Sequence, residues 1–402
     1  MNMKKKNAGF DPSADSGRAE FCGRWRPATG APPLSYFAAS NSGCGFVSYF
    51  DEIFRERCDL RLIIKGGPGT GKSRMLFELG KYAEELGAQV EYYFCSSDPD
   101  SLDGIVARMP DGRTAGAQDA TAPHAEEASL PGARDSIFDL GAFWNAAQLR
   151  RSRAEIERLN LEKSRAWRQA FGCLAAAREL KEAALELARG VIDSDRLKKA
   201  AYRAAQDARR RACRTEISSA LPLPPEKRLH SALHTPHLSL GMKGAVSLGG
   251  IGYGAREVFV MSDELLPGSG ELFVSALAEC AEKEGTRCRV SPDPLCPSFT
   301  TAFACGEVFF TAERGAVLPD GAVCHRVGMR RFIDLSALRS MNDDYSRLCE
   351  LSEKAVGEAL RAMSRASLAH FALEDIYSTA MDFDAKEAAV HRLCEDFFTP
   401  LL

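Results

Sequence analysis

The sequence predicts an α/β fold made of two related halves, each with a mainly parallel sheet and an inserted helical hairpin. A short apolar strand at residues 60–66 leads through a glycine-rich loop into an amphipathic helix. Residues 255–291 repeat this order of strand, loop and helix. Long segments rich in Ala, Leu, Glu and Arg follow in both halves, and this composition favours helices.

The composition is that of a globular protein with two or three domains. The 402 residues are 45% hydrophobic and 27% charged, and the net charge of −3 gives no general signal for binding polyanions. No apolar run reaches the roughly eighteen residues that a membrane helix needs, so we expect no membrane contact. Thirteen cysteines without a C-x-x-C pair favour reduced thiols and a cytoplasmic location, and no zinc-ligand spacing is present.

Changes in composition along the chain predict the domain boundaries. A polar, mobile tail is expected at residues 1–33. The first domain is expected at residues 34–220, with its helical hairpin inserted at about 144–218. A linker at residues 221–244 then leads to a second domain, at 245–402, with a helical C-terminal part.

Residues 66–73 read GGPGTGKS and match the phosphate-loop (P-loop) pattern G-x-x-x-x-G-K-[ST] in full. The backbone N–H groups of such a loop, with the N-terminus of the next helix, bind phosphate oxygens. Lys72 is expected to contact the β and γ phosphates, and the Ser73 hydroxyl to ligate Mg²⁺. No guanine-specific N-K-x-D pattern is present, which favours ATP. The predicted nucleotide-binding residues are Gly66, Gly67, Pro68, Gly69, Thr70, Gly71, Lys72, Ser73 and Arg74.

Acidic residues follow the next two predicted strands, at the sheet edge where ligands bind in open α/β folds. Asp119 ends a weak strand, and we expect it to hold Mg²⁺ through water together with Ser73. Asp98, in an acidic turn, is expected to orient the attacking water. Asp98 equally suits a turn or a helix cap, and His124 suits a structural role as well as a catalytic one.

The second half carries a degenerate copy of the loop. Glu271 places a negative charge where a triphosphate would lie, which opposes binding. Leu272 cannot ligate Mg²⁺. We therefore expect a structural or regulatory copy, with a site for a cation or another ligand as the alternative. The aligned pairs are Lys72 with Glu271, Ser73 with Leu272, Asp98 with Asp293, and Asp119 with Glu313.

A helical arm is predicted after the first P-loop unit. Residues 144–190 show an apolar heptad seam with many small side chains, and a second helical segment follows a turn. This order predicts an αα-hairpin. Residues 150–214 contain eighteen basic and nine acidic side chains, a net charge of +9 (18 − 9). A solvated helix with i,i+4 ion pairs explains this charge, and the alternative is a surface for an acidic protein or a nucleic acid.

Several segments carry a resemblance to a known family. They are GGPGTGKS, CSSDPDSLDG, DATAPH, IFDLGAFW and, near the C-terminus, ALEDIYSTAMDF. From about Tyr36 onward the chain resembles an uncharacterised bacterial (Firmicutes-type) family of tandem P-loop ATPase-like proteins. The resemblance implies ATP binding and brings no known substrate. The family pattern has an intact loop and a T-A-P-H segment in both halves, and this chain departs from it in the second half.

These features predict an ATP-binding P-loop NTPase with slow, Mg²⁺-dependent hydrolysis coupled to a conformational change. Lys72, Asp119 and Asp98 are the expected catalytic residues, and Ser73 and Asp119 are the expected Mg²⁺ residues. Two alternatives remain, a small-molecule kinase and a nucleotide-gated scaffold without turnover.

Overall fold

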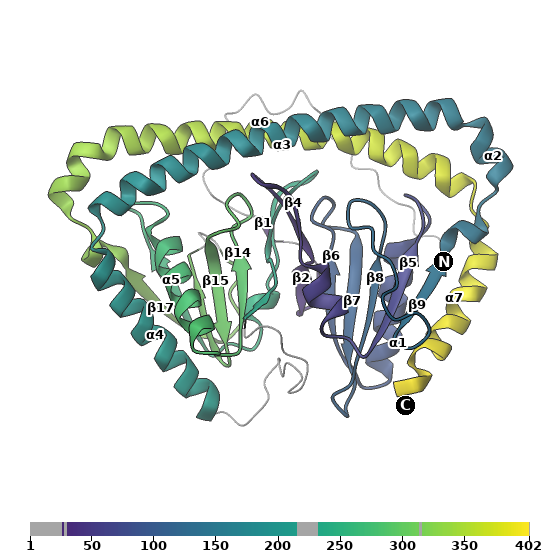
Figure 1. Cartoon of the computed structure of the whole chain (residues 1–402), viewed down its shortest axis with the longest axis horizontal. Coiled ribbons are helices and arrows are strands. Elements are labelled where there is room, and N and C mark those ends of the chain that lie inside the picture. The colour runs from purple at the N-terminus through teal and green to yellow at the C-terminus, as the bar shows by residue number, and fades with distance from the viewer. Residues whose placement is uncertain (1–25, 28–29, 215–231, 313–315, 402) are drawn as a thin grey trace.

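The computed structural model describes residues 26–27, 30–214, 232–312 and 316–401. Two six-stranded sheets lie next to each other beneath a pair of long helices that cross the molecule (Figure 1). Most of the predicted tail at residues 1–33, the first part of the predicted linker and Glu313 lie outside the described residues. The α/β class is confirmed, with two sheets that are mixed because each contains one antiparallel strand.

The first sheet contains the strand that precedes the intact loop. Adjacent strands of this sheet are parallel, except that β7 is antiparallel to both of its neighbours. The weak strand predicted to end at Asp119 is present and fully buried. Its small side chains suit this central position, because neighbouring elements cover both faces of the sheet. The strand order is β2 (Ser35–Phe37), β6 (Gln89–Phe94), β7 (Leu102–Arg108), β8 (Thr114–Asp119), β5 (Leu60–Lys65) and β9 (Asp135–Asp139).

The second sheet has the same order of parallel and antiparallel pairings as the first. Its edge strand β10 (Ala232–His234) lies in the segment predicted as a linker. The alternating apolar residues of that segment form strands because they pair with neighbouring strands of a sheet. The other strands are β14 (Cys288–Pro292), β15 (Thr300–Cys305), β16 (Val308–Thr311), β13 (Glu257–Ser262) and β17 (Val323–Gly328).

Two small sheets lie between the halves, and several short helical turns occur elsewhere in the chain (Figure 1). In one small sheet, β12 (Gly244–Ser247) pairs with β1 (Arg26–Pro27) and β11 (Leu238–Gly241). The other pairs β3 (Ala39–Ser42) with β4 (Gly45–Ser48). The short helical turns are η1 (Asp51–Arg55), η2 (Leu140–Phe143), η3 (Gly250–Gly252), η4 (Met329–Phe332) and η5 (Thr399–Leu401).

The long helices correct the predicted hairpin. After the short helix α2 (Ala146–Arg151), α3 (Arg153–Val191) packs along α6 (Leu335–Thr379) of the other half. Small residues of both helices, such as Ala177 and Ala359, are buried where they meet, and this allows the helices to approach closely. A row of small apolar residues allows another helix to approach closely, but it does not determine which helix that is. The pattern in α3 was therefore compatible with packing against α6 as well as against α4.

The two helices that follow α3 and α6 are exchanged between the halves. Helix α4 (Ser194–Arg214) belongs to the first half but packs against α5 (Ser269–Lys283), in the core of the second sheet. Helix α7 (Phe383–Phe398) belongs to the second half but packs against α1 (Lys72–Glu85), in the core of the first sheet. Figure 1 shows α4 and α7 along the outer sides of the sheets that they cover.

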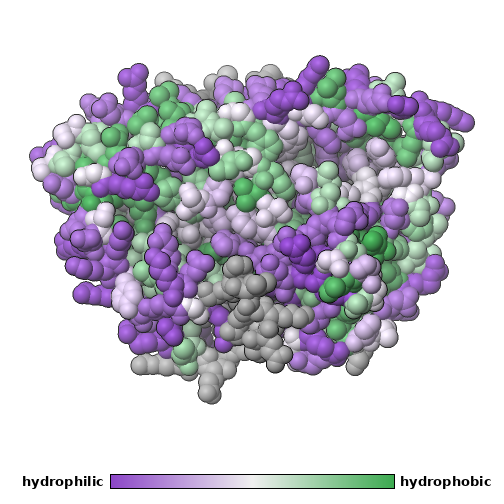
Figure 2. Space-filling model, in the orientation of Figure 1, coloured by the Kyte–Doolittle hydropathy of each residue, from purple (hydrophilic) through white to green (hydrophobic). Residues whose placement is uncertain are grey.

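The basic arm pairs largely with itself where it is exposed. Arg158 forms ion pairs with Glu155 at 2.6 Å and with Glu162 at 2.5 Å, and Arg153 pairs with Glu157 at 2.7 Å. Figure 2 shows hydrophilic residues spread over the visible face, with smaller groups of hydrophobic residues between them. Among the described residues, no helix combines the length and the apolar character needed to cross a membrane.

Candidate functional site

The phosphate loop joins the C-terminal end of β5 to the first residue of α1, as the motif predicts. Gly69 has a φ of 68°, in the left-handed region that side chains disfavour. A Cβ atom on Gly69 would also lie 2.4 Å from the backbone oxygen of Glu374, in helix α6. This position therefore requires glycine for two reasons, the turn itself and the close approach of the second half.

Lys72 and Ser73 hold the loop against the edge of the sheet. The Lys72 ammonium donates to the carbonyl oxygens of Gly66 and Gly67, at 3.0 and 2.6 Å. It also lies 3.5 Å from an oxygen of Asp119. The Ser73 hydroxyl accepts a hydrogen bond of 2.9 Å from the Leu102 N–H, at the start of β7.

Asp103, Asp119 and His124 form a compact, buried cluster beside Lys72. Their ligand atoms all lie within 4.8 Å of one another, an arrangement that could hold a metal ion. Nε2 of His124 is 3.6 Å from Asp103, and its ring stacks on Phe50 at 4.5 Å. The Asp119 carboxylate also accepts hydrogen bonds from the Thr121 N–H and hydroxyl. The structure thus brings Asp119 and Lys72 together, as expected.

Asp103 follows Asp98 by five residues, and it is the acid that enters the cluster. Burial is the main cause that raises the pKa of Asp103 to about 6, and the nearby Asp119 charge acts in the same direction. His124 and Lys72 oppose this shift. The sequence carried one usable signal for Asp103. Because β7 runs antiparallel to β8, an acid at the start of β7 faces the same sheet edge as Asp119 at the end of β8.

The side chains of Asp98 and Arg74 form ion pairs outside the cluster of Asp103, Asp119 and His124. Asp98 forms an ion pair of 2.7 Å with Lys243 of the second half, and its backbone oxygen closes the turn with Ser101. The turn interpretation therefore describes the contacts that Asp98 makes. Arg74 is exposed and pairs with Glu78 at 2.8 Å and with Glu387 of α7 at 3.3 Å.

Side chains near the end of α6 cover the loop from the other half. The ring of Tyr377 packs against that of Trp144, with centroids 5.6 Å apart, and both rings lie against Gly67. Burial lowers the pKa of His370, and Lys163 and Lys72 lower it further. No sequence pattern predicts these contacts, because they arise from the path of α6 over the loop.

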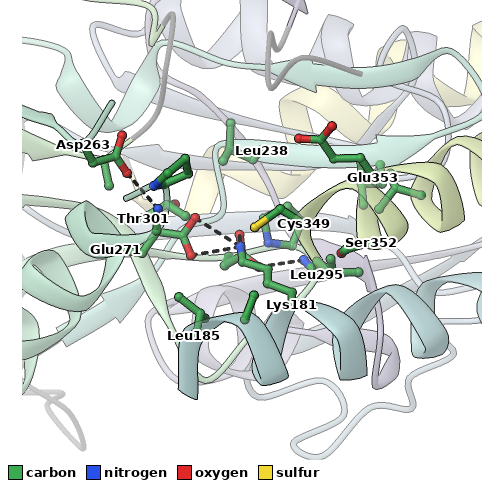
Figure 3. A pocket seen from close by; sticks show the side chains of 18 of the residues that line it. Lys181, Leu185, Leu238, Asp263, Glu271, Leu295, Thr301, Cys349, Ser352 and Glu353 are labelled. Atoms are coloured by element: carbon green, nitrogen blue, oxygen red, sulfur yellow. Dashed lines mark hydrogen bonds and ion pairs between the residues drawn. The ribbon is translucent and has the colours of Figure 1, made fainter. Parts of the chain in front are cut away.

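At the corresponding loop of the second half, a lysine from α3, Lys181, lies beside the acidic residue Glu271. Its ammonium lies 2.9 Å from Glu271 and 2.9 Å from Asp293. Figure 3 shows Lys181 reaching from its helix toward Glu271, beside a cavity of about 260 Å³. Burial raises the pKa of Glu271 to about 7, with Asp293 contributing and Lys181 opposing. The Glu271 carboxyl group, expected to repel a triphosphate, thus belongs to a partly buried network with Lys181 and Asp293.

Comparison with models of known protein families, with curated proteins and with solved structures finds no match for this chain. The two loop regions are therefore interpreted from their own chemistry. The first combines a complete P-loop, a lysine and a buried carboxylate cluster, and the second combines an acidic loop with a lysine from α3.

Proposed function

We propose that the first half binds Mg·ATP at residues 66–73 and hydrolyses it slowly. The observation that carries this proposal is the placement of Lys72, at the N-terminus of α1 and 3.5 Å from Asp119 at the end of β8. In P-loop NTPases the lysine binds the phosphates, and an acidic residue at the end of a neighbouring strand holds the Mg²⁺ ion. We also propose that the second half is a degenerate copy of the first, since its sheet has the same strand order.

The residues of the loop fit the chemistry of a nucleotide phosphate. The Lys72 ammonium would exchange its two loop carbonyls for phosphate oxygens, which the backbone N–H groups at the start of α1 would also bind. Bound Mg²⁺ supplies charge neutralisation between the β and γ phosphates. The Ser73 hydroxyl would ligate this ion and Asp119 would hold one of its waters, an oxygen-rich set that Mg²⁺ prefers. Asp103 is placed better than Asp98 to orient a water, because Asp98 is bound to Lys243.

The path of α6 favours a conformational role for the nucleotide. Because the backbone of Glu374 lies directly against Gly69, a change in the loop must be accommodated by α6. Helix α6 also packs along α3, which holds Lys181 at the second loop. We therefore propose that nucleotide binding and hydrolysis at the first loop alter the packing of the long helices. In the alternative, a nucleotide-gated scaffold, binding alone alters this packing and the nucleotide is not hydrolysed.

Replacing Lys72 with Ala tests the nucleotide site. We expect the affinity for Mg·ATP to fall about 10- to 100-fold, since the variant loses a charged hydrogen-bonding group. Isothermal titration calorimetry measures binding, and phosphate release measures turnover. Lys81→Ala is the matched control, because Lys81 is an exposed lysine on the same helix that pairs with Glu84. Wild-type protein that binds no nucleotide, or a Lys72→Ala variant that binds it normally, would contradict the proposal.

Replacing Asp119 with Asn tests the metal position. The side chain keeps its shape but loses the charge that holds a metal-bound water. We expect the Mg²⁺-dependent part of ATP binding to weaken about 10- to 100-fold, as for other residues that support a metal through its ligands. Titrations with Mg²⁺ and with EDTA separate this part from binding of the nucleotide alone. Equal Mg²⁺ dependence in both proteins would place the metal elsewhere.

A further inference from the structure

A second lysine reaches the phosphate loop, from the helix that the second half contributes to the first. Lys386 lies in the first turns of α7 and is only 1% exposed. A Cβ atom on Gly71, the residue before Lys72, would lie 3.2 Å from the Lys386 Nζ. The ammonium is therefore packed against the last glycine of the P-loop, where helix α1 begins.

The Lys386 ammonium has no hydrogen bond and no ion pair with any of the described residues. Its nearest ring is Phe383, with the centroid 5.8 Å from Nζ. Burial lowers the pKa of Lys386 and Arg74 lowers it further, while the more distant charges of Glu78 and Glu387 oppose the shift. The N-terminus of α1 carries a partial positive charge of its own, so a second cation at this place is unfavourable without an anion. Buried charges normally make a direct ion pair or hydrogen bond, and the Lys386 ammonium makes neither with the described residues, although Glu78 and Glu387 act on it from a distance.

The other half shows what this position contains when the loop is degenerate. The N–H of Lys386 bonds to the carbonyl of Asp382, the capping residue of α7. In the same way, the N–H of Leu197 in α4 bonds to the carbonyl of Asp193. Lys386 and Leu197 therefore occupy equivalent places in the two exchanged helices. Leu197 is 4% exposed and belongs to the apolar core, so a buried charge at this position is not a requirement of the fold.

We propose that Lys386 binds a phosphate group of the nucleotide, so that the C-terminal helix completes the site on the first half. This inference rests on the proposed function and extends it, because it assigns a residue of the second half to the phosphates. A phosphate at the loop would give the Lys386 ammonium a direct negative partner, whereas Glu78 and Glu387 act on it only from a distance. Binding of the nucleotide would then join α7 to the P-loop through a direct charge contact.

The test compares full-length wild type with Lys386→Met, which keeps most of the side-chain volume and removes the charge. We expect Lys386→Met to fold with an unchanged or raised melting temperature, since a buried, unpaired charge is lost. Its affinity for Mg·ATP, measured by calorimetry, should fall about tenfold or more. Lys386→Arg keeps the charge and should restore most of the affinity, which a purely structural role would not require. Arg392→Met, which removes an exposed cation of the same helix, is the control and should bind as wild type does.

Inorganic pyrophosphate separates failure of this inference from failure of the proposed function. One outcome is that wild type fails to bind Mg·ATP but is stabilised by pyrophosphate, while Lys386→Met is not stabilised by pyrophosphate. In that case Lys386 binds phosphate and the nucleotide proposal is wrong. Normal affinity of Lys386→Met for both compounds overturns the role of Lys386 while leaving the P-loop proposal intact. If neither compound binds wild type, both are wrong. Should Lys386→Met fail to fold, the same comparison is made with Lys386→Gln, and the expected results are unchanged.

Discussion

Replacing Lys181 with Met will lower the free energy of unfolding by about 3 kcal/mol at pH 8. The substitution leaves the carboxylates of Glu271 and Asp293 close together without their shared cation. Breaking a buried ion pair by removing one partner costs about 3–5 kcal/mol, and the lower end applies because the Lys181 side chain keeps 21% exposure. Chemical denaturation followed by circular dichroism measures the change.

The loss from Lys181→Met should depend on pH in a defined direction. Glu271 has a pKa of about 7 even with Lys181 present, so the folded variant takes up a proton more readily than the unfolded chain. Its stability relative to wild type should therefore be lower at pH 8 than at pH 5.5. Adding Glu271→Gln to Lys181→Met should recover most of the loss, because one buried charge is removed. A loss that is the same at both pH values, or one that Glu271→Gln does not relieve, would show that the two charges are not coupled.

Replacing Glu91 with Gln will destabilise the contact between the two sheets by about 3–5 kcal/mol. The Glu91 carboxylate accepts hydrogen bonds of 3.0 and 3.3 Å from Arg57 and also pairs with Arg289, on the other sheet. All three side chains are more than nine-tenths buried. The neutral amide would leave two guanidinium charges buried without a counter-charge, and guanidinium groups do not lose their protons at any working pH.

Denaturation with guanidinium chloride as a function of pH tests the role of Glu91. The two arginines hold the pKa of Glu91 well below its usual range, against the effect of burial. Its stabilisation is therefore complete above the ordinary carboxyl pKa and is lost as the pH falls below it. The difference between wild type and Glu91→Gln should shrink in acid. Glu84→Gln is the control, since this half-exposed acid pairs with Lys81 and should change stability by less than about 1 kcal/mol. A Glu91→Gln variant as stable as wild type would contradict this account.

The sequence was sufficient to predict the elements that depend on local pattern. The strand, the loop and the first helix follow from short-range rules on apolar runs and glycine, and they lie where predicted. Asp119 could be predicted as well, because the end of a strand beside the P-loop has a fixed place in the sheet. The sequence was not sufficient to predict which helix each long helix packs against. The apolar seam of α3 is the same whether it packs on α4 or on α6.

The lysines missed by the sequence interpretation come from a distant part of the chain. Lys181 and Lys386 reach their loops from helices that are contributed by the opposite half. Nothing in the residues around them distinguishes these lysines from the many solvated ones on the same helices. The pairing of Asp98 with Lys243 has the same origin. Contacts of this kind follow from topology, which short patterns do not encode.

The exchange of α4 and α7 has a consequence for the history of the chain. Val390 and Phe398 of the second half belong to the core of the first sheet, and Leu197 and Ala201 of the first half belong to the core of the second. Each half is thus structurally incomplete when separated from the other. The second half cannot be deleted without removing α7 and opening the core of the first sheet, whatever its own loop binds. The unit that can be inherited is therefore the interlocked pair of halves.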